Sequence, residues 1–238
     1  EMRPRASTTD CDVYPTLHAA APLQTFAYHE GKLLADVALY RRWGHLHGES
    51  SYRWRSGIKH DCSKIMELSE TPQGLLNGLG ELVDLESDCL FPMLKSSELA
   101  NGRTSEPQRW MVVPQRQIGE ETAVLAQQAP KTWRYLMSHA ELLDRRGSVI
   151  YRKRPRFSVF GIGGYSFSSW KIAVSGFYKS MQFVRLGPYR NKPIVLDDTG
   201  YVLACQTEEE AIFLYEMLTS VPAREFYSSL TFWDAKRP

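Results

Sequence analysis

Four short β-prone segments lie between residues 156 and 205, separated by glycine, proline or asparagine. They are Phe157–Phe160, Lys171–Ser175, Gln182–Arg185 and Tyr201–Cys205. Their β-branched and aromatic residues favour strands, whereas the intervening residues favour tight turns. Because short strands joined by turns pair with their neighbours, this part of the chain is predicted to form a mainly antiparallel sheet.

Three other segments have helical periodicity. Apolar residues recur at helical spacing over residues 33–43, and residues 208–219 begin with acidic residues that complement the helix dipole. The clearest predicted helix spans residues 130–146, with Pro130 near its start. Its apolar stripe is expected to face the core and consists of Trp133, Leu136, Met137, Ala140 and Leu143.

Two further segments have the pattern of strands. Residues 52–59 alternate toward a glycine turn at Gly57, and residues 110–114 form a β-prone run that ends at Pro114. Helices and strands alternate irregularly along the chain. The predicted fold class is therefore α+β, with mixed, mainly antiparallel sheets and a few packing helices.

The 238 residues, 43% of them hydrophobic, suffice for one large domain or two small ones. Glycines follow the first predicted helix, so we divide the chain into an N-terminal linker or helical extension, residues 1–51, and a larger domain, residues 52–238. The chain begins at Glu1 rather than Met and stops after an aromatic segment. We therefore expect it to be part of a longer protein.

No apolar run approaches the ~18 residues that a membrane-spanning helix needs. We therefore expect a cytoplasmic protein without membrane contact. The cysteines lie singly along the chain, without the close pairs typical of zinc sites or small disulfide-linked scaffolds, at Cys11, Cys62, Cys89 and Cys205. We predict reduced thiols and no bound metal.

The net charge of +2 conceals an uneven distribution along the chain. Residues 103–192 contain 16 basic and 5 acidic residues, a net charge of +11. The flanking blocks carry −6 over residues 67–102 and −5 over residues 193–238. A basic block between acidic ones is typical of a nucleic-acid-binding face on an otherwise neutral domain; the alternative is ordinary solvated charge.

Basic residues are densest in residues 145–156, where six of twelve are basic. Arginine donates planar, bidentate hydrogen bonds to phosphates and guanine edges. Six cations around one turn repel one another, which favours a bound polyanion over a solvated loop. The candidate DNA contacts are Arg145, Arg146, Arg152, Lys153, Arg154, Arg156 and, further along, Lys171, with Arg53, Arg55 and Lys59 around Gly57 as a secondary strip.

The sequence lacks convincing catalytic motifs. Residues 160–164 are glycine-rich, but a Ser-rich, β-prone segment follows them, which favours a tight turn over an S-adenosylmethionine loop. Amino-methylation of DNA needs an Asn/Asp-Pro-Pro-aromatic loop, and the chain has no Pro-Pro pair. Asp84, Glu86, Asp88 and Lys95 lack the spacing of a nuclease metal site, and no nucleophile stands beside the scattered histidines. We therefore predict no catalytic, cofactor or metal site in this chain.

Six short segments occur in a characteristic order, namely Ser56–Lys59, Asp88–Leu99, Pro130–Leu136, Leu142–Arg146, Tyr151–Arg156 and Trp170–Gly176. In order and composition they resemble the specificity, or target recognition, domain of Taq-type adenine-N6 DNA methyltransferases. In that family a Gly-Ile-Lys hairpin precedes a Phe/Tyr-Pro-Leu-Leu-Lys element. The resemblance covers residues 52–238 and departs from the family at Ser97-Glu98, where a basic or glycine residue often precedes Asp.

The resemblance implies a mixed α/β domain that contacts bases in the major groove, opposite a Rossmann-like methyltransferase domain of the same chain that flips out an adenine. S-adenosylmethionine would then bind elsewhere in the parent protein. We therefore predict a domain that recognises double-stranded DNA and lacks the catalytic domain. The alternatives are a stand-alone methyltransferase or nuclease, and a protein-interaction domain with a basic face.

Overall fold

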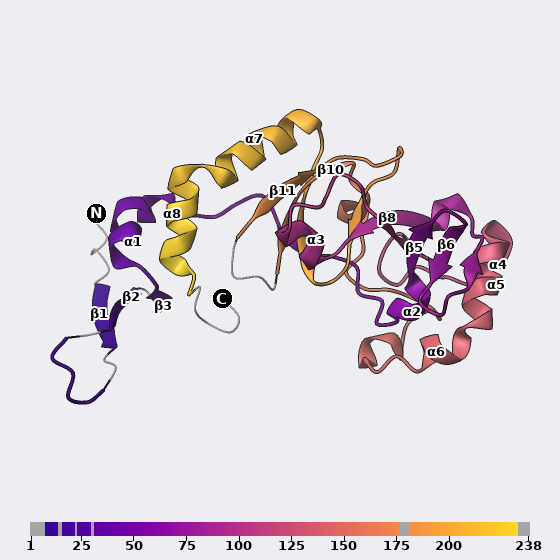
Figure 1. Ribbon diagram of the computed structural model, residues 1–238, viewed down its shortest axis with the longest axis horizontal. Coiled ribbons are helices and arrows are strands. Elements are labelled where there is room, and N and C mark those ends of the chain that lie inside the picture. The colour runs from indigo at the N-terminus through magenta and orange to yellow at the C-terminus, as the bar shows by residue number, and fades with distance from the viewer. Residues whose placement is uncertain (1–7, 14–15, 22, 30, 177–180, 233–238) are drawn as a thin grey trace. The chain divides into compact units, whose positions relative to one another are not determined.

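The computed structural model describes residues 8–13, 16–21, 23–29, 31–176 and 181–232. The chain divides into two compact units, a smaller one formed by Glu1–Ser51 with Glu216–Pro238 and a larger one formed by Tyr52–Tyr215 (Figure 1). The last helix thus packs with the N-terminal segment, whereas the sequence had grouped it with the larger domain.

The smaller unit combines a three-stranded antiparallel sheet with two helices. Its elements are β1 (Thr8–Val13), β2 (Gln24–His29), β3 (Lys32–Leu34), α1 (Val37–Trp43) and α8 (Val221–Leu230). The predicted helix over residues 33–43 starts only at Val37, because Lys32–Leu34 pairs with β2. Asp36 caps α1 by accepting a hydrogen bond from the Leu39 backbone N–H at 2.9 Å.

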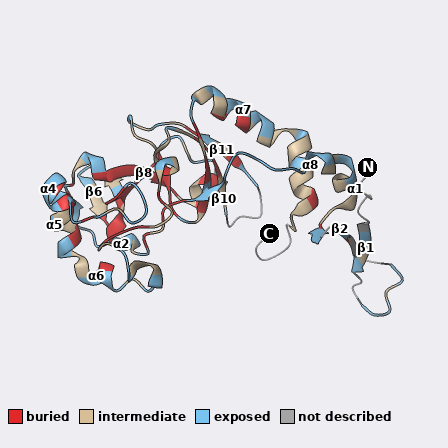
Figure 2. Cartoon of the chain, turned by 180° about the vertical axis from the view of Figure 1, so that it is seen from behind, coloured by how far each residue is buried: buried red, intermediate tan, exposed pale blue. Residues whose placement is uncertain are grey.

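A six-stranded sheet forms one half of the larger unit, in the order β12-β8-β9-β5-β6-β7. The strands are β5 (Glu67–Thr71), β6 (Gly74–Asn77), β7 (Leu82–Val83), β8 (Leu90–Leu94), β9 (Arg109–Val112) and β12 (Val195–Leu196). All pairs are antiparallel except β12 with β8. Every residue of β8 is buried, and Leu90, Phe91 and Met93 of this strand belong to the main hydrophobic core (Figure 2).

The second sheet of the larger unit has four antiparallel strands in the order β11-β10-β13-β4. They are β4 (Arg55–Ser56), β10 (Trp170–Ser175), β11 (Phe183–Leu186) and β13 (Gly200–Cys205). The strands predicted at β10, β11 and β13 are confirmed, as is the helix α7 (Glu208–Thr219). The strand predicted over residues 52–59 is reduced to the two residues of β4.

The larger unit also contains short helices, of which α3 packs against β10 of the four-stranded sheet: α2 (Ser63–Met66), α3 (Ser96–Ala100), α4 (Leu125–Gln128), α5 (Pro130–Ser138) and α6 (Ala140–Asp144). The single helix predicted over residues 130–146 is wrong, because the backbone at His139 (φ −108°, ψ 16°) divides it into α5 and α6. Leu136 and Leu143 are buried as expected, but Met137 is 41% exposed.

The strand predicted over residues 157–160 is also wrong. Phe157 is fully buried with φ at +66°, a left-handed conformation that cannot continue a strand, and Phe160 forms only an isolated bridge to Lys59. The predicted α+β class, with its predominance of antiparallel pairing, is confirmed.

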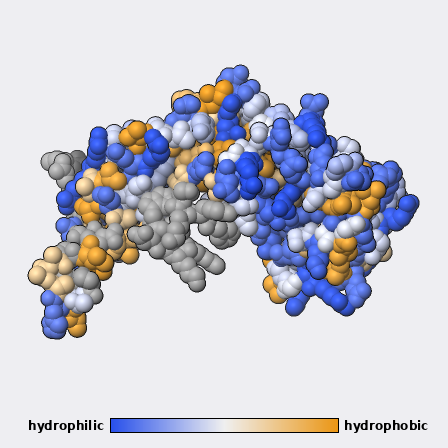
Figure 3. Space-filling view, viewed as in Figure 1, coloured by the Kyte–Doolittle hydropathy of each residue, from blue (hydrophilic) through white to orange (hydrophobic). Residues whose placement is uncertain are grey.

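Hydrophilic residues cover most of the visible face of the larger unit, interrupted by small apolar patches (Figure 3). Among the described residues, no helix combines the length and hydropathy needed to cross a bilayer.

Candidate nucleic-acid interface

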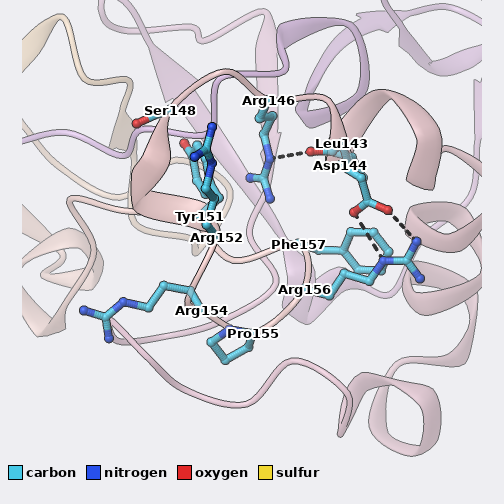
Figure 4. A pocket seen from close by; sticks show the side chains of 10 residues that line it. All are labelled: Leu143, Asp144, Arg146, Ser148, Tyr151, Arg152, Arg154, Pro155, Arg156 and Phe157. Carbon is cyan, nitrogen blue, oxygen red and sulfur yellow. Dashed lines mark hydrogen bonds and ion pairs between the residues drawn. The ribbon is translucent and has the colours of Figure 1, made fainter.

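The basic segment after α6 forms one wall of a pocket of about 330 Å³ (Figure 4). A short 3-10 turn, Val149–Tyr151, folds the segment back so that residues 143–157 enclose the space. The pocket is lined by Leu143, Asp144, Arg146, Ser148, Tyr151, Arg152, Arg154, Pro155, Arg156 and Phe157. Four of the predicted DNA contacts therefore meet here, with a single carboxylate among them.

Arg146 forms the inner wall of the pocket and is held by backbone carbonyls. Its Nε donates to Leu143 O at 2.8 Å, and one of its terminal nitrogens donates to Ser158 O at 2.7 Å and to His60 O at 3.3 Å. The guanidinium also lies 3.8 Å from the centre of the Tyr151 ring. Burial lowers the pKa of Arg146, which remains a cation at neutral pH. Its hydrogen bonds serve the fold first, leaving little of the guanidinium for a ligand.

Two of the predicted contacts form ion pairs at the outer edge of the cluster. Arg145 pairs with Glu141, one helical turn earlier. Arg156 donates two hydrogen bonds to Asp144, at 2.6 and 3.3 Å, and packs against the Phe157 ring. The hydrogen bond from Arg156 keeps the pKa of Asp144 below its usual value. Both arginines are therefore partly neutralised by their own neighbours.

Arg152, Lys153 and Arg154 are exposed, as are Arg145 and Arg156, but they differ from those two in their lack of ion-pair partners among the described residues. None of the three has an ion pair in the part of the chain that the structure describes. The Arg154 guanidinium lies 5.7 Å from the centre of the Phe160 ring, a cation–π distance. These three side chains are the cations most available to an external anion.

A loop that the sequence analysis did not select borders the same surface. Thr122 donates a hydrogen bond to the carbonyl oxygen of Arg156, and the side chain of Gln115 accepts one from the Val159 N–H at 3.1 Å. Gly119 approaches Arg154 so closely that a Cβ on this glycine would lie 3.3 Å from a guanidinium nitrogen. In the sequence, this loop is indicated only by the polar residues Gln115, Arg116 and Gln117, which lie between a strand and a helix.

The secondary strip of cations lies at the four-stranded sheet. Arg53 and Arg55 are exposed, and the Arg55 guanidinium lies 5.7 Å from the centre of the Tyr165 ring. Lys59 is engaged by two carboxylates, Asp61 at 2.6 Å and Asp198 at 3.1 Å, whose hydrogen bonds raise the pKa of the lysine. Of the strip, the two arginines are the better candidates for contact with an anion.

Lys171 requires a correction, because it does not lie on the surface. Its side chain is 1% exposed, and its ammonium donates to the carbonyl oxygen of Ile194 at 2.7 Å. Burial lowers its pKa to about 7. The side chain is enclosed by the protein, so it is not available to a DNA phosphate.

Three of the residues weighed for nuclease chemistry, Asp84, Glu86 and Lys95, are engaged in structural contacts. Asp84 pairs with Lys131, and Lys95 pairs with Glu67. Glu86 accepts hydrogen bonds at the start of α5, which lower its pKa to about 2 even though desolvation favours the protonated form. Within the described ranges, no group of three or more His, Cys, Asp or Glu side chains is placed to hold a metal.

The glycine-rich segment 160–164 packs against protein backbone. Gly161 has φ at +63°, and a Cβ at this position would lie 2.2 Å from the carbonyl oxygen of Gly57. Position 161 therefore requires glycine, because a side chain there would collide with the backbone of Gly57.

Comparison with known proteins relates the chain to a type II methyltransferase. Over 229 residues, 96% of its length, it is 44% identical to the type II methyltransferase M.NspV of Nostoc sp. (strain ATCC 29411 / PCC 7524). The chain is similar to part of a type II methyltransferase. It spans 48% of that protein, or about half of it.

No family model matches the chain. Among solved structures, the Type IIL restriction-modification enzyme MmeI in complex with DNA aligns with 70% of this chain and 21% of that protein, with a TM-score of 0.42 and 9% identity.

Proposed function

We propose that the chain is the sequence-specific, double-stranded DNA recognition domain of an S-adenosylmethionine-dependent adenine-N6 methyltransferase of the restriction-modification type. The observation that carries the proposal is the arginine-lined pocket, two of whose arginines are exposed and without ion pairs among the described residues, in a chain similar to about half of a type II methyltransferase. The Taq-type motifs add the adenine specificity. The catalytic domain, in the same parent chain, would bind the cofactor, and the whole would act in the cytoplasm.

In this proposal the basic segment positions the duplex. Phosphate contacts account for most of the affinity of such domains and fix their register, whereas contacts to base edges supply the specificity. Arg152, Lys153 and Arg154 present their charges to the DNA, and Arg146 holds the turn that carries them. Arg53 and Arg55 would extend the contact along the DNA.

The proposal is tested by titrating the 238-residue chain against a random-sequence fluorescent duplex over a series of salt concentrations. The pocket variant carries Arg152→Ala, Arg154→Ala and Arg156→Ala. The control variant loses the same charge at three exposed cations outside the pocket, through Arg103→Ala, Lys131→Ala and Arg134→Ala.

We expect the logarithm of affinity to fall steeply with the logarithm of salt concentration, and the pocket variant to lose slope equivalent to about two to three phosphate contacts. The control variant should keep most of the slope. Binding to heparin without binding to duplex DNA would instead support a protein-interaction domain. Tight calorimetric binding of S-adenosylmethionine to this chain would support a self-sufficient enzyme and contradict the proposal.

A further inference from the structure

The tip of the loop that borders the arginine pocket carries three exposed residues, Gln117, Ile118 and Gly119. Ile118 is 48% exposed, an apolar side chain presented between polar neighbours. Gly119 has φ at +84°, a left-handed conformation that favours glycine. The loop therefore turns sharply at its tip and presents an amide and an apolar group side by side.

Contacts on both sides hold this tip in place. The Glu120 carboxylate accepts hydrogen bonds from the backbone N–H groups of Arg116 at 2.6 Å and Gln117 at 3.1 Å. Gln115, which is 4% exposed, donates to the carbonyl oxygen of Gln117 at 2.8 Å. A loop fixed by its own hydrogen bonds has little conformational entropy left to lose when it meets a ligand.

The arginine that begins the loop fastens it to the main core. The Arg116 guanidinium lies 4.6 Å from the Phe91 ring centre and 4.7 Å from that of Phe167, and it donates to the carbonyl oxygen of Asp88 at 2.5 Å. The tip is thus held against Phe91 of β8, a strand whose residues are all buried. Exposed residues on a rigid support can be aligned with a ligand to within a fraction of a bond length.

Arg154 is the cation that stands beside this tip. A Cβ added at Gly119 would lie 3.3 Å from one of its guanidinium nitrogens. The Arg154 side chain points away from Arg156 and Asp144 (Figure 4). Because the exposed Arg154 side chain has no carboxylate partner in the described part of the chain, its donor nitrogens can reach an external ligand, while one face of the guanidinium lies toward the Phe160 ring.

We propose that Gln117, Ile118 and Arg154 form the element that reads base edges in the DNA major groove, a proposal that rests on the function proposed above. The side-chain chemistry matches that task. An arginine donates a bidentate pair to guanine O6 and N7, a glutamine amide pairs with adenine N6 and N7, and an apolar group contacts a thymine methyl. A phosphate site alone would not use the isoleucine.

The test is a binding selection with the 238-residue chain on duplexes that carry a randomised stretch, followed by sequencing of the bound pool. The variants are Arg154→Lys, which keeps the charge but loses the planar fork, and Gln117→Ala. Lys153→Ala is the matched comparison, because it removes a neighbouring charge outside the reading element. The salt dependence of binding to a random duplex is measured for all of them.

We expect the wild-type chain to enrich one motif. Arg154→Lys should lose about 10- to 100-fold of discrimination at one base pair while keeping its salt slope, and Gln117→Ala should do the same at another base pair. Lys153→Ala should keep the motif and lose a slope of about one.

If both reading-element variants select the wild-type motif undiminished, the inference is overturned while the proposed function stands. If the wild-type chain binds no duplex, or binds without enriching a motif, both the proposed function and the inference are contradicted. Circular dichroism and urea unfolding of each variant show that the substitutions act on the DNA contact and not on the fold.

Discussion

The Lys171 ammonium donates a hydrogen bond to the carbonyl oxygen of Ile194 at 2.7 Å from a side chain that is 1% exposed. The lysine lies in β10, an inner strand of the four-stranded sheet, and burial there lowers its pKa from 10.5 to about 7. A cation in this position costs stability whenever it is protonated, because desolvation penalises the charged form.

Lys171→Met should therefore stabilise the fold most at low pH. Between pH 7 and 10.5 the unfolded wild-type chain binds more protons at this site than the folded chain, so wild-type stability rises with pH. The advantage of the variant should shrink by about 1.4 kcal/mol for each pH unit in that window. Urea unfolding of both proteins at pH 6, 8 and 9.5 measures it. Lys64→Met, at an exposed position, should show no such trend; an equal difference for Lys171→Met at every pH would contradict the buried-cation account.

The sequence predicted the regular elements well where local signals and the tertiary structure agree. Turn-forming residues flank the strands β10 and β13, and α7 starts with three glutamates. Their positions could therefore be predicted from local preferences. The predictions failed where distant contacts decide. Phe157 belongs to a β-prone run, but its ring packs against Trp133 in the core with a left-handed backbone, which no local pattern reveals.

The same limit applies to the candidate site. Local composition located the basic cluster, yet it could not separate Arg146 from Arg152, because the partners of Arg146 include the carbonyl of His60, far away in the sequence. Nor could it show that β10 places Lys171 inside the sheet. The loop around Gln117 could not be predicted as part of the candidate site, because only the folded structure brings Gly119 close to Arg154.

Asp144→Asn should strengthen DNA binding. Asp144 is the one carboxylate in the pocket, and its ion pair with Arg156 withholds a cation from the DNA. Removing the negative charge frees that cation and ends a repulsion of phosphate, so the salt slope should steepen by about one. Anisotropy titrations over a salt series measure this. Asp84→Asn breaks a comparable ion pair with Lys131, outside the pocket, and should leave binding unchanged. Weaker binding by Asp144→Asn would show that the ion pair itself organises the site.

Arg146→Ala and Arg152→Ala should separate fold from binding. Loss of Arg146 removes the side-chain donor to the carbonyls of Ser158 and His60, and one of the two donors to that of Leu143, which should cost about 2–4 kcal/mol of unfolding free energy. Loss of the exposed Arg152 should change stability by less than about 0.5 kcal/mol but reduce the salt slope by about one. Urea unfolding and DNA titration are run on both variants. An Arg146→Ala variant with the unfolding free energy of the wild type would contradict the structural role that the hydrogen bonds of Arg146 indicate.

Glu86→Gln should weaken the attachment of α5 in a pH-dependent way. The Glu86 carboxylate accepts hydrogen bonds from the backbone N–H groups of Lys131 and Thr132, both at 2.8 Å, and from the Thr132 hydroxyl at 2.7 Å. Glutamine has only one acceptor oxygen and no charge for the helix dipole, so the loss should be about 1–2 kcal/mol at pH 7. The pKa of Glu86 falls to about 2 in the folded chain, so the stabilisation of the fold by its carboxylate is present above pH 4.5 and is lost as the pH drops through 2.

The difference in unfolding free energy between variant and wild type, measured by urea unfolding, should therefore shrink from pH 5 to pH 2.5. Glu141→Gln, which removes only an exposed ion pair, should cost less than about 0.5 kcal/mol throughout; a Glu86→Gln difference that stays constant with pH would show that the charge of this cap is not what holds the helix.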